Sequence, residues 1–381
     1  MAHCRERIFL KHMQKTSVLH VMNYAASYRG NFIDSLEALD KKIAEDGMGN
    51  VYMFCAAARE NSSMQWISEM QQRGLRVFFL TEDRKADTKL IKKVMKDENV
   101  VAIHTHFISM QQFLPVYFAV GRNPIPVFMH MHNHSTEAKN PIKRILRRYI
   151  YRRCRMISCS ESVYRSIERD YPNNIKYSVD NGVNFERLDD FSQLTHKEFS
   201  IPDEDTVFLI FGFDFYRKGV DLAVRAVEQL RKEGKKYSLL ISLSTNFEMV
   251  EKNIRDIIGE LPDWVHIIKA RNDVASLYNF AELFLSPSRE EGLPYSVVEA
   301  SYCRCSVVMS DISAQVNLKI PYGKWCVAEN VEDLAKAIEA SVAEHGLKLE
   351  NMDSVRNQMK KNYSLDNWAE KIQTIYREVM K

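Results

Sequence analysis

Apolar, β-branched segments recur along the whole chain, and segments with helical spacing of apolar residues separate them. The first such segment follows a candidate helix cap at Asn31 and repeats apolar residues on one helix face: Phe32, Ile33, Leu36, Leu39 and Ile43. The runs that predict strands begin in two series, at Val18, Val51, Arg76, Val100, Pro126 and Arg155, and at Val207, Ser238, Val265, Glu282, Ser306 and Trp325. Strands that alternate with helices form right-handed crossovers and a parallel sheet. We therefore predict an α/β fold of two doubly wound domains that face each other across a cleft.

The length of 381 residues is too great for one compact core, which also indicates two domains. A polar, acidic stretch separates the two series of strands. We predict an N-terminal extension at 1–16, a first domain at 17–185, a linker at 186–200 and a second domain at 201–362. The remaining residues, 363–381, are expected to form a helix that crosses back to the first domain.

Composition excludes several classes of protein. The net charge of +3 gives no general attraction to nucleic acid. No apolar run approaches the roughly 18 residues that a membrane-spanning helix needs. The seven cysteines are odd in number and mostly lie in apolar surroundings, which indicates reduced, buried thiols and a cytoplasmic location.

The segment SPSREEGLPYSVVEAS carries the most informative chemistry. It is predicted to be the end of a strand, a glycine-containing loop and a helix that starts after Pro294. Ligands of open α/β sheets bind at this edge, and amides near Gly292 and Leu293 would face an anion at the helix start. Glu291 in the loop and Glu299 in the helix can accept hydrogen bonds from sugar hydroxyls. The alternative is a surface helix with two solvated acids.

A second candidate site lies in FGFDFYRKGVD, where Arg217 and Lys218 stand between a strand and a helix. Two cations at such a junction are well placed for a pyrophosphate. The alternative is a helix turn with solvated basic residues. The chain has neither a Walker loop nor a GxGxxG fingerprint, which counts against ATPase and dehydrogenase activities.

Histidines cluster at the end of the fifth predicted strand, in HMHNHS. His130 and His132 point to the same side of the strand, at the edge where ligands of such sheets bind. A metal site is the weaker alternative, because no acid stands among these histidines as in HExxH. His104 and His106 also end a strand, where a structural or cleft-lining role is expected.

Together these motifs resemble the retaining glycosyltransferases with two Rossmann-like domains, specifically glycosyltransferase family 4. The resemblance implies that Glu291 contacts the donor hexose and Glu299 the ribose. It implies that Arg217 and Lys218 stabilise the departing diphosphate and that His132 supports the anomeric centre. The further donor-binding residues that it implies are Gly30, Asn31, Ser288, Gly292, Leu293 and Pro294.

The sequence departs from the family pattern at two places. Phe213 and Asp214 follow the strand glycine where the family has a basic residue, which leaves Arg217 as the candidate replacement. Arg304, Cys305 and Ser306 stand where the family usually has Gly-x-Pro, so the turn there must be rebuilt.

The resemblance implies transfer of a sugar from a nucleotide diphosphate sugar, with UDP-sugars favoured, to a hydroxyl of a glycan or lipid-linked glycan. No cofactor and no metal are expected. The alternatives are a sugar-nucleotide 2-epimerase and a non-catalytic partner subunit.

The basic run at 139–155 carries an apolar stripe. It is either a solvated helix packed on the sheet or a peripheral contact with an anionic membrane at its cytoplasmic face.

Overall fold

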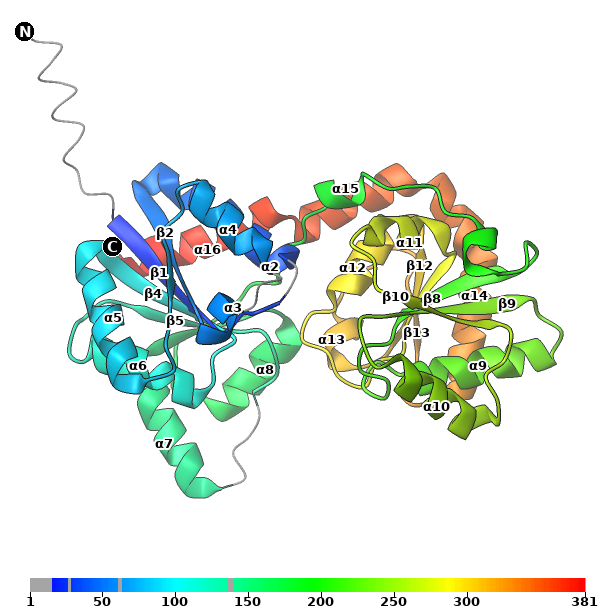
Figure 1. Ribbon diagram of the computed structural model, residues 1–381, viewed down its shortest axis with the longest axis horizontal. Coiled ribbons are helices and arrows are strands. Elements are labelled where there is room, and N and C mark those ends of the chain that lie inside the picture. Colours follow the sequence, from blue (N-terminus) through cyan, green and yellow to red (C-terminus); the bar gives the residue numbers. More distant parts are fainter. Residues whose placement is uncertain (1–15, 27–28, 61–63, 136–139, 381) are drawn as a thin grey trace, which may run out of the picture. The chain divides into compact units, whose positions relative to one another are not determined.

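The computed structural model describes residues 16–26, 29–60, 64–135 and 140–380, and the chain divides into two compact units. The first unit comprises residues 1–182 and 365–381, and the second comprises 183–364 (Figure 1). The predicted extension at 1–16 lies outside the described residues except for Thr16, which begins the first strand.

The first unit contains a seven-stranded sheet in the order β3-β2-β1-β4-β5-β6-β7, in which every pairing is parallel. Its strands are β1 (Thr16–Met22), β2 (Met48–Phe54), β3 (Val77–Phe79), β4 (Val100–His106), β5 (Val127–Met131), β6 (Cys154–Ser158) and β7 (Lys176–Ser178). The pattern of apolar residues did not predict β7, which is a three-residue edge strand. The strand order reverses between β1 and β4, so their carboxyl ends form a place where doubly wound folds bind ligands.

Helices connect these strands in the first unit. They are α2 (Gly30–Ile43), α3 (Ala56–Glu60), α4 (Gln65–Gln72), α5 (Arg84–Asp97), α6 (Met110–Val120), α7 (Pro141–Tyr151), α8 (Glu161–Asp170) and α16 (Leu365–Met380), with the short helix η1 (Ala44–Asp46). The predicted cap at Asn31 is wrong, because α2 begins one residue earlier and Asn31 lies buried in its first turn.

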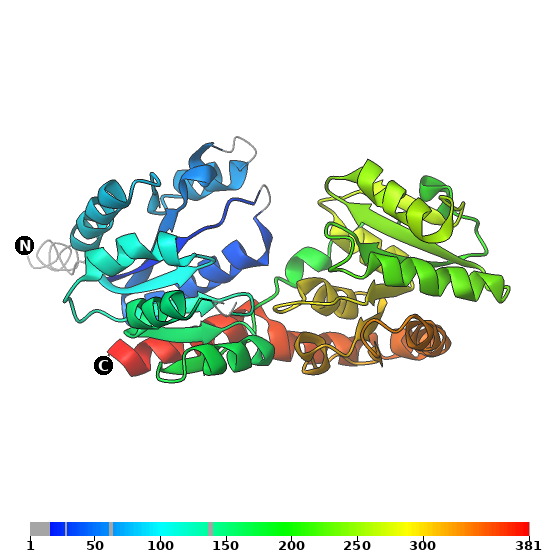
Figure 2. The same ribbon diagram turned by 90° about the horizontal axis from the view of Figure 1, so that it is seen from below.

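The second unit contains a six-stranded parallel sheet in the order β10-β9-β8-β11-β12-β13. Its strands are β8 (Thr206–Phe211), β9 (Tyr237–Leu243), β10 (Val265–Lys269), β11 (Leu283–Ser286), β12 (Ser306–Ser310) and β13 (Lys324–Cys326). The order reverses between β8 and β11, and helices cover both faces of the sheet (Figure 2).

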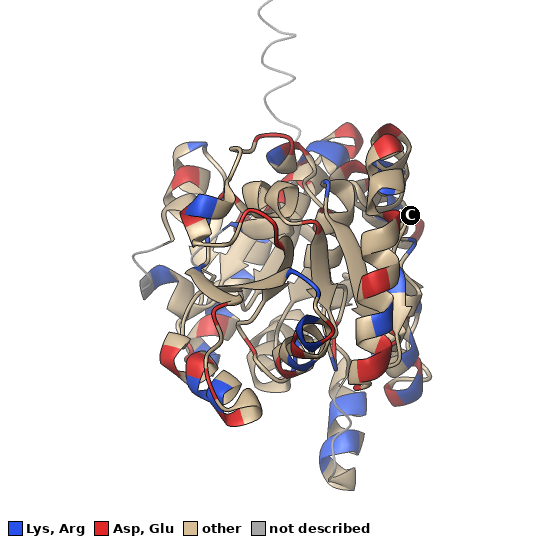
Figure 3. Cartoon of the chain, turned by 90° about the vertical axis from the view of Figure 1, so that its right-hand side faces the viewer, with Lys and Arg blue, Asp and Glu red and all other residues tan. Residues whose placement is uncertain are grey.

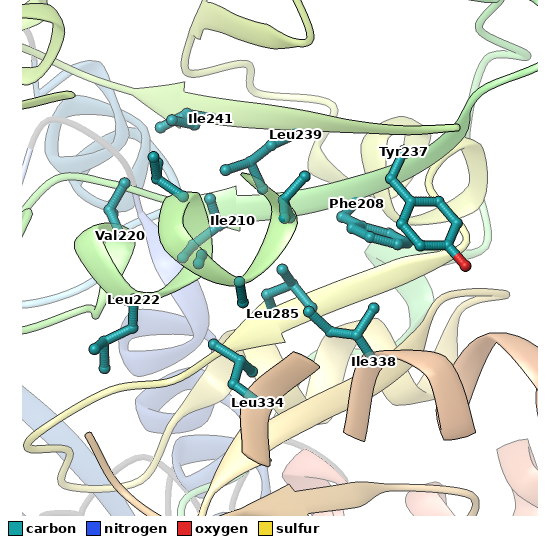
Figure 4. Close-up of a cluster of buried hydrophobic side chains, with 14 of the residues drawn as sticks. Phe208, Ile210, Val220, Leu222, Tyr237, Leu239, Ile241, Leu285, Leu334 and Ile338 are labelled. Carbon is teal, nitrogen blue, oxygen red and sulfur yellow. The ribbon is translucent and has the colours of Figure 1, made fainter. Parts of the chain in front are cut away.

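The helices of the second unit follow the same alternation. They are η2 (Glu186–Leu188), η3 (His196–Phe199), α9 (Val220–Lys232), α10 (Phe247–Ile258), α11 (Val274–Phe280), α12 (Tyr295–Tyr302), α13 (Ser313–Val316), α14 (Val331–Glu350) and α15 (Met352–Tyr363). Figure 4 shows the core on one face of the sheet, where strand residues such as Leu239 and Leu285 meet Val220 of α9 and Ile338 of α14. The apolar strands are therefore held by amphipathic helices, as the periodicity predicts.

The predicted linker at 186–200 is instead part of the second unit. Leu188 is completely buried, and the Ser192 amide donates a hydrogen bond to Ser276 Oγ at 2.9 Å. The stretch is rich in acids and polar residues, which is why it looked like a linker. Its few apolar and backbone contacts nevertheless pack the segment 186–200 against the second unit.

Candidate active site

Two loops meet at the carboxyl edge of β8 and β11, and a glycine allows them to approach closely. Gly219 has φ of +70°, and a Cβ there would lie 2.1 Å from the carbonyl oxygen of Pro287. The Arg289 amide also donates a hydrogen bond to the Arg217 carbonyl oxygen at 2.8 Å. The loop after β8 and the loop after β11 thus form one backbone unit, and only glycine fits at their contact.

Glu291 lies at the centre of this unit and is almost fully buried. Its Oε1 is 2.5 Å from Lys218 Nζ and accepts a hydrogen bond from Ser288 Oγ at 2.9 Å. Its Oε2 is 3.8 Å from Arg217 Nη1. The structure therefore brings together four residues from the two candidate sites of the sequence, Glu291, Ser288, Arg217 and Lys218. A buried carboxylate with two cations beside it is satisfied in charge and in hydrogen bonding.

Arg217 has further partners that hold its guanidinium at the site. Its Nε donates to Asp214 Oδ2 at 2.8 Å, and its Nη1 donates to the Glu290 carbonyl oxygen at 3.1 Å. Phe213 is 52% exposed, and its ring lies 4.9 Å from Lys218 Nζ and 5.3 Å from the guanidinium carbon of Arg217. The aromatic ring that replaces the family's basic residue thus contacts both remaining cations.

Arg289 forms a bidentate ion pair that the sequence analysis did not identify. Its two terminal nitrogens each lie 2.8 Å from an oxygen of Asp221, which is in the first turn of α9. This pair joins the loop after β11 to the helix after β8 and fixes the geometry of the loops that carry Lys218 and Glu291.

Glu299 lies in α12, is buried and has partners within the second unit. It forms an ion pair with Arg187 of η2, and it accepts a hydrogen bond from the Tyr278 hydroxyl at 3.1 Å. Burial and the nearby Glu299 charge raise the pKa of Tyr278 well above its ordinary value, so the phenol stays a donor. Neither Arg187 nor Tyr278 was predicted from the sequence. Arg187 lies in a segment that resembles a linker, and Tyr278 lies within an apolar helix.

A network of buried polar side chains forms hydrogen bonds to the loop after β11. Gln315 donates to Ser286 Oγ at 2.6 Å, and Ser310 donates to the Ser288 carbonyl oxygen at 2.6 Å. Ser310 also contacts Gln315, with 2.8 Å between hydroxyl and amide oxygen. All four residues are buried. A small cavity adjoins this network and is lined by Ile210, Phe211, Lys218, Phe284, Leu285, Ser286, Ser288 and Ser296.

Helix α12 starts at Tyr295, directly after the predicted donor-binding residues Gly292, Leu293 and Pro294. Leu293 is buried, and Pro294 occupies the N-cap position. The positive end of the helix dipole therefore lies beside Glu291 and the two cations. This is an edge at which an anionic group of a ligand would be stabilised.

The turn after α12 shows how the missing Gly-x-Pro is replaced. Lys348 of α14 is buried and its Nζ donates hydrogen bonds to the carbonyl oxygens of Cys303, at 3.0 Å, and Cys305. Burial lowers the pKa of Lys348 to about 8. A lysine from a distant helix thus satisfies the carbonyl groups of the rebuilt turn.

The other predicted site residues lie in the first unit. Gly30 and Asn31 form the start of α2, and His132 directly follows β5. The His132 ring lies beside His106, with 3.2 Å between Nε2 and Nδ1. These positions are at carboxyl ends of β1 and β5, as the strand pattern predicts.

The fold and this loop pair define a class. Two doubly wound units, each with a parallel sheet, are the architecture of GT-B glycosyltransferases, so the predicted fold class is confirmed, whereas membership of family 4 stays a prediction. Residues 191–363 match the family model for glycosyl transferases group 1.

Relatives and solved structures agree with this class. A lipopolysaccharide core biosynthesis mannosyltransferase of Rhizobium leguminosarum is 27% identical over 45% of this chain and 50% of its own. A Campylobacter jejuni N,N'-diacetylbacillosaminyl-diphospho-undecaprenol α-1,3-N-acetylgalactosaminyltransferase is 31% identical over 31% of each chain. The matched segments thus span about half, or less, of these relatives' length.

Among solved structures, a glycosyltransferase of Rickettsia africae has a TM-score of 0.80 and 17% identity, covering 96% of this chain and 99% of its own. The Anabaena protein HepE, in complex with UDP and glucose, has a TM-score of 0.75 and 13% identity over 95% and 99%. At these identities the likeness concerns the fold.

Proposed function

We propose that this chain is a retaining glycosyltransferase that moves a hexose from a nucleotide diphosphate sugar, with UDP-sugars favoured, to a glycan or lipid-linked glycan. The observation that carries the proposal is the meeting of Lys218, Arg217 and Ser288 on Glu291, beside the start of α12. The relatives described above include enzymes of lipopolysaccharide and undecaprenol-linked glycan synthesis, which supports this acceptor class.

The contacts suggest how the donor would be handled. A diphosphate at the carboxyl edge would compete with Glu291 for Lys218 and Arg217, whose charges would stabilise the diphosphate as it departs. Glu291 would then be released to accept hydrogen bonds from hexose hydroxyls. Glu299, held by Arg187, would accept hydrogen bonds from the ribose. No cofactor or metal is proposed at this donor site, and His132 remains the proposed support for the anomeric centre.

Thermal unfolding with UDP, GDP, ADP and TDP tests the donor site. A ligand present at about 100 times its Kd stabilises the folded chain by about 2.7 kcal/mol. We expect one base to raise Tm in the wild type and in Glu290→Gln, whose side chain is exposed, but not in Glu299→Gln. If no base raises Tm, or if Glu299→Gln responds like the wild type, the donor site is elsewhere.

Consumption of the donor separates transfer from mere binding. We expect Glu291→Gln to lower turnover of the sugar nucleotide more than it lowers nucleotide affinity, because its contact is with the hexose. Both would be measured with radiolabelled donor and isothermal titration. Nucleotide binding without sugar transfer to any glycan acceptor would instead support a non-catalytic partner, and release of an epimerised sugar would support the 2-epimerase.

Helix α7 supports a peripheral contact with an anionic membrane. Ile150 is buried, but the rest of the predicted stripe is not packed on the sheet: Ile142, Leu146 and Tyr149 are exposed, as is Ile145. Basic residues cover the same helix, which projects at the bottom of Figure 3. No helix in the described part of the chain is long and apolar enough to cross a membrane. Exposed apolar groups beside cations are typical of interfacial helices.

Vesicle sedimentation tests this contact. We expect binding to anionic phosphatidylglycerol vesicles, weakened in Ile142→Ser/Ile145→Ser, and little binding to neutral phosphatidylcholine vesicles. Ile175→Ser is the control, because Ile175 is exposed in the same unit but outside α7. Equal sedimentation of all three proteins would show that α7 is not the contact.

A further inference from the structure

Five histidines from three neighbouring strands lie together in the first unit. His20 of β1 pairs in register with His104 of β4, and His106 of β4 pairs with His130 of β5. His132 follows β5, and the ring centroids of neighbouring members lie 4.2 to 5.5 Å apart. Spacing along one strand could not show this cluster, because its members are distant in sequence.

An asparagine fixes the proton positions in this cluster. Asn50 Nδ2 donates to the Leu36 carbonyl oxygen at 2.9 Å, so Asn50 Oδ1 accepts from His20 Nε2, also at 2.9 Å. The other nitrogen of His20, Nδ1, therefore accepts from His106 Nε2 at 3.1 Å. This leaves a lone pair on His106 Nδ1, which points at His132 Nε2.

In His130, neither ring nitrogen forms a hydrogen bond with any group of the described chain. His130 is only 2% exposed. A buried polar group without a partner is costly, and an ion bound to one of these nitrogens would satisfy it.

We propose that His106, His130 and His132 form a binding site for a divalent transition-metal ion of the zinc type. One nitrogen from each of the three lies within 4.8 Å of the others. The 3.2 Å between His106 Nδ1 and His132 Nε2 suits two ligands of one tetrahedral ion at bond lengths of about 2.0–2.1 Å. The chain through His20 to Asn50 supplies the second-shell hydrogen bond that orients His106.

The ligand set decides the class of metal. Imidazole nitrogens suit Zn²⁺, Cu²⁺, Ni²⁺ and Co²⁺, whereas Mg²⁺ and Ca²⁺ prefer oxygen ligands. His132 is the least buried of the three, so an ion would enter past its ring. In the second trio, His20, His104 and His106, every ring is completely buried, which makes it the weaker candidate. The proposal does not rest on the contacts of Glu291 and Lys218, and it shares only His132 with the proposed function.

Cobalt titration of the chelator-treated full chain tests the site. We expect one Co²⁺ per chain with the visible absorption of a tetrahedral ion, displaced by Zn²⁺. Loss of a second-shell group costs about 10–100-fold in affinity, so loss of the ligand in His132→Gln should cost at least about 100-fold. His134→Gln is the control, because His134 Nε2 is 2.6 Å from Ser162 Oγ and outside the trio.

The proposal is overturned by two results. One is a wild-type chain that takes up no stoichiometric Co²⁺ or Zn²⁺. The other is unchanged affinity in both His132→Gln and His130→Gln, which would place the ion elsewhere. Circular dichroism of each variant shows that it is folded, and His132→Gln remains informative if the more buried His130→Gln does not fold.

Discussion

At the scale of single residues, Gly219 is the position where the candidate site tolerates least change. Replacement by alanine adds a Cβ 2.1 Å from the Pro287 carbonyl oxygen, in a left-handed conformation. The conformation alone costs roughly 1–2 kcal/mol, and the clash with backbone adds about 1–3 kcal/mol. We expect Gly219→Ala to lower the free energy of unfolding of the second unit and its nucleotide affinity, measured by urea denaturation and titration.

The control for this change is Gly234→Ala. Gly234 has φ of +89°, but a Cβ there meets nothing within 4 Å. The free energy of unfolding of Gly234→Ala should therefore fall only by the conformational cost, and the variant should keep its nucleotide affinity. Equal losses in the two variants would mean that the approach of the two loops is not what requires glycine.

Lys348 gives a second prediction at this scale, because its folded-state pKa of about 8 lies below its ordinary value of 10.5. The buried ammonium costs stability below about pH 8, and this cost is relieved as the pH rises toward 10.5. The full effect corresponds to about 3 kcal/mol. We expect the free energy of unfolding of the wild type, relative to Lys348→Met, to rise between pH 7.5 and 10. A constant difference would show that Lys348 is not desolvated.

At the scale of elements, the histidines on β1, β4 and β5 predict acid sensitivity of the first unit. The folded-state pKa values of His20, about 4, and His130, about 3, lie below the ordinary 6.5. Their contribution is complete above pH 6.5 and is lost as the pH falls toward these values, because the unfolded chain binds more protons. Between pH 6.5 and 5, each fully buried histidine should lower the free energy of unfolding by about 2 kcal/mol.

Hydrogen exchange at pH 6.5 and 5, with chelator present, measures this loss of stability separately in each of the two units. We expect backbone protection to fall more in residues 16–182 than in 183–364, because the second unit carries fewer buried histidines, although the pKa of His345 there also falls to about 4. His130→Leu should reduce the dependence on pH. A pH dependence that is equal in both units would assign it to other groups.

The elements themselves were largely predictable, and the partners of the site residues were not. Strands such as β8 and β11 are apolar runs bounded by glycine or proline, so they can be located from local pattern. The short strand β7 has no such pattern, because edge strands need little apolar surface. The contacts Arg187–Glu299 and Lys348–Cys303 join positions far apart in sequence, so only the fold reveals them.

At the scale of the whole molecule, the chain returns to its first unit after completing the second, so stability of the N-terminal half depends on its last residues. Helix α16 packs on α2, and its buried face carries Trp368, Ile372, Ile375 and Tyr376. The Tyr376 hydroxyl also lies 2.6 Å from His104 Nδ1, beneath the histidine cluster. The last residues of the chain are thus part of the core that holds β1 and β4.

We therefore expect Ile372→Ala to destabilise the first unit by about 2–5 kcal/mol, the usual cost of truncating a fully buried isoleucine. Hydrogen exchange should show lost protection in 16–182, although the substitution lies 190 residues or more away in sequence from that segment. Lys371→Ala, on the exposed face of the same helix, is the control. Because the second unit has its own core, its protection and its thermal response to nucleotide should persist in Ile372→Ala. Loss of protection in both units together would instead show that they unfold as one cooperative body.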